Sequence, residues 1–237
     1  MTTERYVRSE ALLGEGSTAR LRHAHVAVFG LGGVGSYTVE ALARMGIGEL
    51  TLIDGDAYTE SNLNRQLFAT MRTLGCAKVD AAKERIMEID PDTAVHTHRL
   101  FLTPENLSDI DLDAFDYIAD AIDTVSAKLA LIKAAHAKSI PIISAMGAGN
   151  KLDPTLFRVA DISRTKVCPL ARAVRTELRR AGILHTKVVY SEEEPREGVG
   201  MNAASGKPIP ASCSFVPSVM GLILAGEVIK DLLKESL

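Results

Sequence analysis

A glycine-rich turn at residues 30–35, with the sequence GLGGVG, sets the strongest limit on the fold. It follows the short β-branched run 26–29 directly and opens a helical pattern over 34–45. The GxGxxG spacing permits a tight turn and lets backbone N–H groups approach a phosphate at the N-terminus of the helix. Residues 49–53 read as the next strand. The segment therefore predicts a strand–turn–helix–strand unit that binds a nucleotide.

The same alternation of strand and helix continues along the chain. Further strands are expected at 94–100, 117–121 and 140–145, and further helices at 77–89 and 127–137. Such alternation is typical of a mostly parallel sheet with right-handed crossovers. Hydrophobic residues make up 46% of the chain and aromatic residues only 5%, which favours aliphatic α/β packing over a β-sandwich. The predicted fold class is α/β, with a Rossmann-like, mostly parallel sheet and helices on both faces.

The C-terminal third predicts an extension of this domain. Its expected elements are antiparallel edge strands at 155–162 and 187–190 and a last helix at 217–234 with a proline in its first turn. Residues 191–206 are acidic and then glycine-rich, which predicts a mobile connection. We therefore expect a nucleotide-binding domain at 1–150 and an extension at 151–237 that packs on the same domain.

Charge and cysteine content exclude several classes of protein. The formal net charge is −3, so binding of a nucleic acid requires a local basic patch. Cys76, Cys168 and Cys213 form no CxxC pair, which argues against a paired-thiolate zinc site and against a disulfide framework. The N-terminal residues do not resemble a signal peptide, and the apolar stretch 216–226 is too short to span a bilayer. We expect a cytoplasmic protein without membrane association.

The polar loop after the second strand favours ATP over NAD as the nucleotide. Asp54 lies 19 residues after Gly35, where an acid normally hydrogen-bonds ribose hydroxyls; the alternative is a tight turn with a solvated carboxylate. The loop presents an amide and a guanidinium that suit a triphosphate rather than a redox cofactor. Lys78 follows Arg65 by 13 residues, although each cation alone is more often a solvated surface charge. The predicted nucleotide-binding residues are Gly30, Gly32, Gly33, Gly35, Asp54, Asp56, Asn62, Arg65, Gln66 and Lys78.

Asp123 is a candidate metal ligand. The run DAID closes the fourth strand at 120–123, and ligands of open α/β sheets bind beyond the carboxyl ends of the strands. A carboxylate beside a triphosphate repels it unless a cation intervenes, which makes Mg²⁺ the natural partner. The alternative is that Asp123 caps the helix at 125–137, and one side chain can do both.

The separated motifs of the first 150 residues keep the order and spacing of a known family. GLGGVG, LIDGD, NLNRQ, Lys78 and DAIDT together resemble the adenylating enzymes that activate ubiquitin and bacterial sulfur-carrier proteins. The opening RYVR at 5–8 resembles the RYxRQ segment of that family, although Ser9 replaces the Gln. The resemblance covers residues 5–150 and implies that this part of the chain is an ATP-binding adenylation domain.

The resemblance also implies roles for individual residues. It implies that catalysis depends on Arg8, Arg65, Lys78 and Asp123, and that the enzyme is a homodimer. In such an enzyme Arg8 reaches the γ-phosphate bound by the neighbouring subunit. The implied contacts are Asp54 with the ribose, Asn62, Arg65 and Lys78 with the phosphates, and Asp123 with Mg²⁺.

The C-terminal third narrows the resemblance. VVYSEEEP at 188–195 and SFVPSVMG at 214–221 resemble the branch of the family that dehydrates N6-threonylcarbamoyladenosine in tRNA, and the two CxxC pairs usual in sulfur-carrier activators are missing. The resemblance implies ATP-dependent activation of the threonylcarbamoyl carboxylate on the adenosine beside the anticodon, followed by cyclisation. Three alternatives remain: activation of the C-terminus of a ubiquitin-like sulfur-carrier protein, an NAD-dependent oxidoreductase, and a non-catalytic nucleotide-sensing module.

A basic helix gives independent support for an RNA substrate. Residues 158–187 contain eight Lys or Arg and two acids, and an amphipathic helix is expected at 169–181. Arg172, Arg175 and Arg179 share one face of that helix, which favours contact with RNA phosphates over a merely solvated face. No aromatic residues alternate with these arginines, so the sequence does not indicate base-specific readout.

Cys168 and Cys213 have two interpretations. Each is a candidate nucleophile for a thioester-forming activator, but neither has a nearby His. Small buried side chains are therefore the favoured interpretation. A sulfur-relay protein is a further candidate partner.

Overall fold

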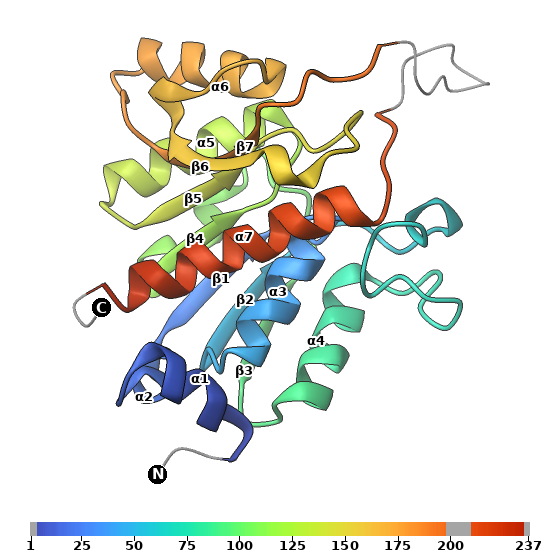
Figure 1. The fold of residues 1–237 in the computed structure, drawn as a ribbon, viewed down its shortest axis with the longest axis vertical. Helices are drawn as coiled ribbons and strands as arrows, with labels where there is room; N and C mark the ends of the chain where they lie inside the picture. The colour runs from blue at the N-terminus through green and yellow to red at the C-terminus, as the bar shows by residue number, and fades with distance from the viewer. Residues whose placement is uncertain (1–3, 198–209, 235–237) are drawn as a thin grey trace.

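The computed structural model describes residues 4–197 and 210–234 and contains one seven-stranded sheet between two layers of helices (Figure 1). The strands are β1 (His25–Phe29), β2 (Glu49–Ile53), β3 (Ala94–His98), β4 (Tyr117–Asp120), β5 (Ile142–Ala145), β6 (Phe157–Asp161) and β7 (Lys187–Ser191). Their order in the sheet is β3-β2-β1-β4-β5-β7-β6, and only the β6–β7 pair is antiparallel. The α/β, mostly parallel fold predicted from the sequence is confirmed. Part of the connection expected to be mobile, residues 198–206, lies outside the described residues.

Seven α-helices and six short 3-10 helices connect the strands in the part of the chain that is described. The α-helices are α1 (Val7–Leu13), α2 (Ser17–His23), α3 (Gly35–Arg44), α4 (Lys78–Ile89), α5 (Val125–Ala137), α6 (Pro169–Arg180) and α7 (Phe215–Leu232). The 3-10 helices are η1 (Glu4–Tyr6), η2 (Glu60–Asn62), η3 (Leu107–Asp109), η4 (Leu112–Ala114), η5 (Pro154–Leu156) and η6 (Ile162–Arg164). The helices expected from periodicity are present with small shifts at their ends, because hydrogen bonds at the termini decide where a helix begins and ends.

The two faces of the sheet carry separate hydrophobic cores. Side chains alternate along a strand, so Val26 and Val28 of β1 enter one core while Ala27 and Phe29 enter the other. The first core is closed by α3, α4 and α7, which Figure 1 shows on the face toward the viewer. The second is closed by α5 and α6. With both faces covered, the central strands are buried along almost their whole length.

The C-terminal third extends the same sheet, and one prediction about it was wrong. β6 is the antiparallel edge strand expected from the sequence. β7, in contrast, is an internal strand that pairs parallel with β5 on its other side, with Ile143 opposite Lys187. The reason is burial on both faces, because Val188 lies in one core and Val189 in the other. A single apolar run of this length does not show how many neighbours a strand has.

The last helix packs against the helix that follows the glycine turn. A Cβ atom at Gly221 of α7 would lie 2.2 Å from the carbonyl oxygen of Val34, so only glycine permits this approach. The Thr38 hydroxyl donates a hydrogen bond of 3.1 Å to the Gly221 carbonyl in the same contact. None of the helices in the described part of the chain is long and apolar enough to cross a membrane.

Candidate nucleotide-binding site

The glycine turn between β1 and α3 is possible only with glycine at its first and last positions. Gly30 has φ +88°, and a Cβ atom there would lie 2.8 Å from the carbonyl oxygen of Ala121. A Cβ atom at Gly35 would lie 1.7 Å from the Gly30 carbonyl oxygen. The turn is therefore held tightly against the end of β4, and α3 begins directly behind it. This is the geometry in which a helix N-terminus receives a phosphate group.

The middle glycines face a cavity that the C-terminal helix helps to close. A Cβ atom at Gly33 would approach Pro217 of α7 to 3.1 Å, whereas one at Gly32 would have no neighbour nearer than the Gln66 amide nitrogen at 4.0 Å. Gly32 therefore leaves open space where a ligand can approach the backbone closely. A side chain at Gly33 would crowd Pro217, so glycine favours the close contact between the turn and α7.

Asp54 is tied to the glycine turn by backbone hydrogen bonds. Its carboxylate accepts a bond of 2.6 Å from the N–H of Leu31 and one of 2.8 Å from the N–H of Asp56. Only 9% of the side chain is exposed. Burial raises the pKa of Asp54, and the ammonium of Lys78 and the two backbone N–H groups oppose that rise. The carboxylate is thus fixed at the end of β2, where a ribose acceptor is expected.

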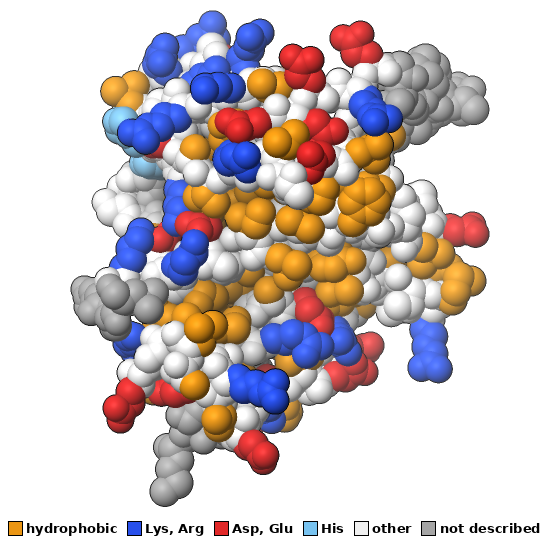
Figure 2. All heavy atoms as spheres, viewed as in Figure 1, with side chains coloured by type: hydrophobic (Ala, Val, Ile, Leu, Met, Phe, Trp, Pro, Cys, Tyr) orange, Lys and Arg blue, Asp and Glu red, His pale blue; other side chains and the backbone are white. Residues whose placement is uncertain are grey.

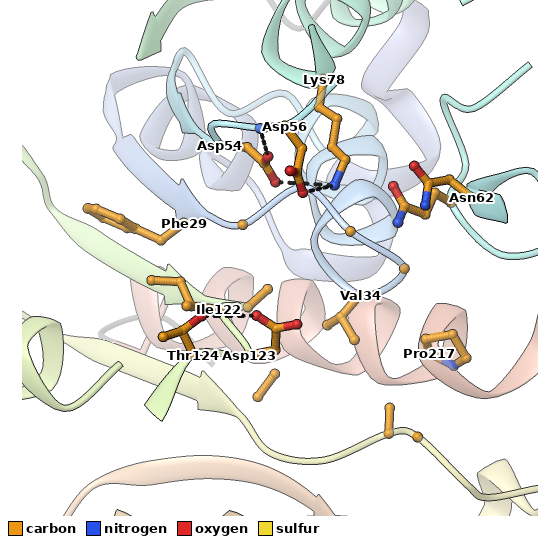
Figure 3. A pocket seen from close by; sticks show the side chains of 18 of the residues that line it. Phe29, Val34, Asp54, Asp56, Asn62, Lys78, Ile122, Asp123, Thr124 and Pro217 are labelled. Carbon is orange, nitrogen blue, oxygen red and sulfur yellow. Dashed lines mark hydrogen bonds and ion pairs between the residues drawn. The ribbon is translucent and has the colours of Figure 1, made fainter. Parts of the chain in front are cut away.

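Lys78 lies beneath the cavity as a buried cation at the first position of α4. Its side chain is 5% exposed, and its Nζ lies 2.8 Å from Asp56 Oδ2 and 3.9 Å from Asp54 Oδ2. Figure 3 shows the three side chains together on one side of the glycine turn. A buried lysine with exposed Asp56 as its nearest partner can change that partner for a phosphate at little cost.

The loop that carries η2 presents the predicted polar residues. Asn62 Oδ1 accepts a hydrogen bond of 3.0 Å from the Thr59 N–H, which fixes the start of η2. The Arg65 guanidinium donates 2.9 Å hydrogen bonds to the carbonyl of Ser61 and to the Asn64 side chain. Gln66 is buried, and its Oε1 has no hydrogen-bond partner among the described residues. A buried acceptor without a partner is costly, so a ligand that supplies a donor stabilises this arrangement.

Asp123 is exposed on the other side of the glycine turn and is not a helix cap. The N-cap residue of α5 is Thr124, and no side-chain hydrogen bond caps this helix. The neighbour that Asp123 contacts is the Thr124 hydroxyl, at 3.5 Å. Figure 3 shows Asp123 across the cavity from Asp54, Asp56 and Lys78. The capping alternative is therefore wrong, and the carboxylate is available to a ligand.

These residues line one cavity of about 750 Å³ beyond the carboxyl ends of β1, β2 and β4. The volume matches that of typical small-molecule sites. Gly35 does not line the cavity, because it lies inside the turn against the Gly30 carbonyl. The predicted residues that do line it are Gly30, Gly32, Gly33, Asp54, Asp56, Asn62, Arg65, Gln66, Lys78 and Asp123.

Part of the cavity wall was not anticipated from the sequence. Phe101, after β3, is 65% exposed and packs on Gly55, where a Cβ atom would lie 2.7 Å from the ring. The opposite wall includes Met146 and Leu170, together with Pro210 before α7. These apolar residues gave no signal in the sequence, because isolated apolar side chains are usually core residues.

Arg8 lies away from the cavity of its own chain. It is exposed on α1, which Figure 1 places near the start of β1, whereas the cavity lies beyond the strand ends. The neighbouring Arg5 and the Tyr6 hydroxyl both bond to Asp90, a fully buried carboxylate that Arg22 also pairs with at 2.7 Å. These contacts fix the N-terminal segment and leave Arg8 directed outward. A role for Arg8 at the nucleotide therefore requires a second chain.

The basic helix α6 is amphipathic as predicted, with Val174 and Leu178 buried. Arg172 and Arg179 are exposed, and Figure 2 shows basic side chains gathered over this end of the molecule. Arg175 differs, because its guanidinium bonds to the Thr165 hydroxyl and, at 3.0 Å, to the Thr165 carbonyl. It is half-buried and holds the loop that precedes α6. The three arginines therefore do not form one uniform exposed face.

The fold and the cavity define a Rossmann-like nucleotide-binding protein whose cavity combines a glycine turn, a buried lysine and an exposed carboxylate. The chain belongs to the ThiF family, whose model matches residues 5–236.

Within that family the chain is similar to enzymes that modify tRNA. It is 43% identical to the tRNA threonylcarbamoyladenosine dehydratase of Bacillus subtilis, over 97% of this chain and 95% of that protein. The Haemophilus influenzae enzyme of the same name is 48% identical over 69% of this chain and 63% of its own length. The crystal structure of the Escherichia coli tRNA N6-threonylcarbamoyladenosine dehydratase in complex with ATP superposes with a TM-score of 0.89 at 32% identity. That match covers 98% of this chain and 95% of the other.

Proposed function

We propose that this protein is an ATP-dependent tRNA threonylcarbamoyladenosine dehydratase. The observation that carries the proposal is similarity along almost the whole chain to dehydratases, one of them solved with ATP. The cavity supports it, because ten of the predicted nucleotide and metal residues line it. A redox domain does not need the Asn62, Arg65 and Lys78 set, so the NAD alternative is disfavoured.

The reaction requires activation of a carboxylate and then ring closure. A carboxylate oxygen of the threonylcarbamoyl group attacks the α-phosphorus of ATP, the bond to pyrophosphate breaks, and an acyl-adenylate forms. A nucleophilic atom of the same group then attacks the activated carbonyl carbon, loses its proton and expels AMP. The net change in the nucleoside is the loss of one water molecule. Most of the acceleration comes from holding the two reactants in line and stabilising charge.

Residues of this chain bind and orient the nucleotide. The backbone N–H groups of the glycine turn meet the phosphates at the N-terminus of α3. Asp54 accepts hydrogen bonds from the ribose hydroxyls. Arg65 and Lys78 balance the charge of the triphosphate, and Lys78 releases Asp56 as it does so.

Asp123 suits a magnesium ion held jointly with phosphates. Mg²⁺ usually binds through one or two carboxylates and keeps its other positions for water and phosphate oxygens. The donor set fits, because Asp123 is exposed to the cavity and no group of three or more His, Cys, Asp or Glu in the described residues forms a closed metal cage. Bound Mg²⁺ offsets the negative charge of the triphosphate during transfer.

The tRNA contact is assigned to the basic end of the molecule. Leu170 of α6 lines the cavity, so the first turn of this helix borders the site, and Arg172 is exposed in the same part of the helix. Arg179 continues the basic surface along the same helix. An RNA backbone that crosses α6 therefore brings its modified nucleoside toward the activated phosphate. Three unpaired thiols, Cys76, Cys168 and Cys213, fit a reducing cytoplasm.

A homodimer is proposed from two independent features. Arg8 is outside its own cavity, so a neighbouring subunit is needed to use it. In addition, Figure 2 shows an apolar band where α7 crosses the front of the molecule, and Phe215 and Leu222 of this helix are 49% and 50% exposed. Residues 215–226 of α7 include no charged side chain, and exposed apolar surface of this kind often marks a protein–protein contact.

The decisive experiment uses purified protein, ATP, Mg²⁺ and tRNA that carries threonylcarbamoyladenosine. The expected product is a nucleoside lighter by one water molecule, detected by mass spectrometry after digestion, with formation of AMP and pyrophosphate. Unchanged tRNA together with ATP-dependent adenylation of a ubiquitin-like carrier's C-terminus would support the carrier-activating alternative and contradict the proposal.

A further inference from the structure

A fully buried ion pair lies directly beneath the cavity. Lys128, in the first turn of α5, and Asp120, the last residue of β4, both have fully buried side chains, and their Nζ and Oδ2 atoms are 2.7 Å apart. Neither residue lines the cavity, and the proposed reaction has no use for either. Burying two charges is expensive, and apolar residues of similar size often give equal or greater stability. The pair therefore calls for an explanation other than stability.

The hydrogen bonds of this pair are made to each other and to neighbouring backbone and side-chain groups. Lys128 Nζ donates to Asp120, to the Ser144 hydroxyl at 3.0 Å and to the Ala145 carbonyl at 3.0 Å. Asp120 Oδ1 accepts a 3.0 Å bond from the Ile122 N–H, and the Ser144 hydroxyl donates to Asp120 Oδ2. No donor of the ammonium group is left over.

These contacts join two walls of the cavity. The bond to the Ile122 N–H fixes the turn that presents Asp123, one residue further along the chain. The bond to the Ala145 carbonyl fixes the end of β5, from which Met146 and Ala148 continue along the opposite wall. Both Ile122 and Ala145 line the cavity themselves. The Asp120–Lys128–Ser144 cluster thus links the carboxylate side to the β5 side of the site, in addition to the pairing of Asp120 with Ser144 in the sheet.

We propose that Lys128, together with Asp120 and Ser144, is a positioning device that holds the Asp123 turn and the end of β5 at a fixed separation. The inference rests on the proposed function only for its activity assay. Lys128 does not line the cavity, and it acts through the orientation of Asp123. A displacement of about 1 Å at a reacting centre lowers the rate roughly a hundredfold. A rigid support of the site therefore explains why the protein keeps a buried ion pair despite the cost of burying its charges.

The test separates positioning from stability with a charge-neutral double variant. Lys128→Met alone leaves Asp120 buried without its partner and risks misfolding, whereas Lys128→Met with Asp120→Asn leaves no unpaired charge. Ser144→Ala is a milder variant that keeps the ion pair. The matched control is Lys187→Met, because Lys187 forms an ion pair with Asp231 at 2.9 Å far from the cavity. Each protein is compared by Tm, by ATP affinity with and without Mg²⁺, and by kcat with tRNA.

The double variant is expected to melt close to wild type and to bind Mg²⁺-free ATP normally. Its gain in ATP affinity on addition of Mg²⁺ shrinks, and kcat falls about tenfold to a hundredfold. Ser144→Ala shows the same change to a smaller degree, and Lys187→Met changes Tm alone. A double variant or Ser144→Ala with wild-type Mg²⁺ response and kcat would overturn the inference. Wild-type protein that binds no ATP or leaves the tRNA unchanged would instead contradict the proposed function.

Discussion

At the scale of single residues, the positive charge of Lys78 is paired with carboxylates of the site itself. Lys78 pairs with Asp56 at 2.8 Å and has Asp54 at 3.9 Å. In the proposed function a bound triphosphate would give the ammonium a far more negative partner, and exposed Asp56 would return to water. Asp54 stays fixed, because the two backbone N–H groups of Leu31 and Asp56 hold it independently of Lys78.

Asp123→Asn is expected to abolish turnover and leave the fold intact. The carboxylate is exposed and supports no helix cap, so its loss removes a metal ligand without removing a structural contact. We expect kcat to fall by at least about a hundredfold, with an unchanged melting temperature. The control is Asp109→Asn, an exposed acid on η3. Full activity with an unaltered requirement for Mg²⁺ would show that Asp123 is not a ligand.

At the scale of helices and strands, sequence patterns predicted the features that depend on residues close together in the chain. The glycine turn, the strands β1 and β2 and the amphipathic α6 follow from spacing within about ten residues, and all were predicted. The site residues that share a motif, such as Asn62 and Arg65, were predicted for the same reason. Strand order in the C-terminal third was not, because pairing of β7 with β5 depends on contacts between distant segments.

Several contacts between distant segments were also out of reach of sequence reasoning. Arg5 and Asp90 are 85 residues apart in the chain, and an isolated acid at a helix end reads as a solvated turn. Lys128 looks like an ordinary surface lysine, although its side chain is fully buried. Arg175 has the helical spacing of a surface residue, and only the fold shows that the Thr165 loop engages it. In each of these examples, a partner residue in another element determines the environment of the side chain.

The N-terminal segment is anchored by the contacts of Asp90 with Arg5, Tyr6 and Arg22. We expect this anchor to stabilise the fold. Burial raises the pKa of Asp90. This effect is outweighed by hydrogen bonds from the Tyr6 hydroxyl and the Asp92 N–H and by the charge of Arg22, so the pKa of Asp90 lies below 3.8. This contribution is present above pH 3.8 and is lost as pH falls through the lower folded value. Asp90→Asn is expected to reduce the free energy of unfolding by about 3 kcal/mol at neutral pH, measured in urea.

The difference between wild type and Asp90→Asn should narrow only at acid pH, below 3.8. Asp92→Asn, an exposed neighbour, serves as the control and should change stability little. Equal stabilities of wild type and Asp90→Asn at neutral pH would show that the anchor contributes nothing measurable.

The arginines of α6 are expected to separate into two kinds in tRNA binding. Replacement of Arg172 and Arg179 by Gln removes two exposed charges, so the log–log salt dependence of tRNA affinity should flatten by about two units. Arg175→Gln should lower the melting temperature instead, because it loses its bonds to Thr165. Affinities are measured at several salt concentrations, and ATP binding serves as the control. Identical slopes for wild type and the double variant would remove α6 from the tRNA interface.

At the scale of the whole molecule, the cavity of a single chain contains an incomplete set of the predicted catalytic residues. Arg65, Lys78 and Asp123 line the cavity, whereas Arg8 lies near the other end of the sheet on a firmly anchored segment. The apolar band over α7 gives a surface through which a second copy can bind. A symmetric pair would present two equivalent sites, each built from both subunits.

Mixing two inactive variants tests whether the site is shared. Arg8→Ala subunits keep their own Asp123, and Asp123→Asn subunits supply an intact Arg8. After subunit exchange, a heterodimer contains one complete site, so a one-to-one mixture should recover about a quarter of wild-type activity. Exchange is verified by mass spectrometry of differently tagged subunits. Absence of recovery in verified heterodimers would place Arg8 outside catalysis or in the site of its own chain.

The contact between α7 and the glycine turn has a consequence for biosynthesis. Thr38 and Gly221 hydrogen-bond across 183 residues of chain, and Pro217 covers Gly33. A ribosome translates the phosphate-binding turn early, but its cover emerges only after nearly the whole sheet has been synthesised. Until then the side of α3 that packs on α7 lacks its cover, so an incomplete chain exposes this apolar surface. A chain that ends before α7 would therefore lack the part of the cavity wall that Pro217 contributes.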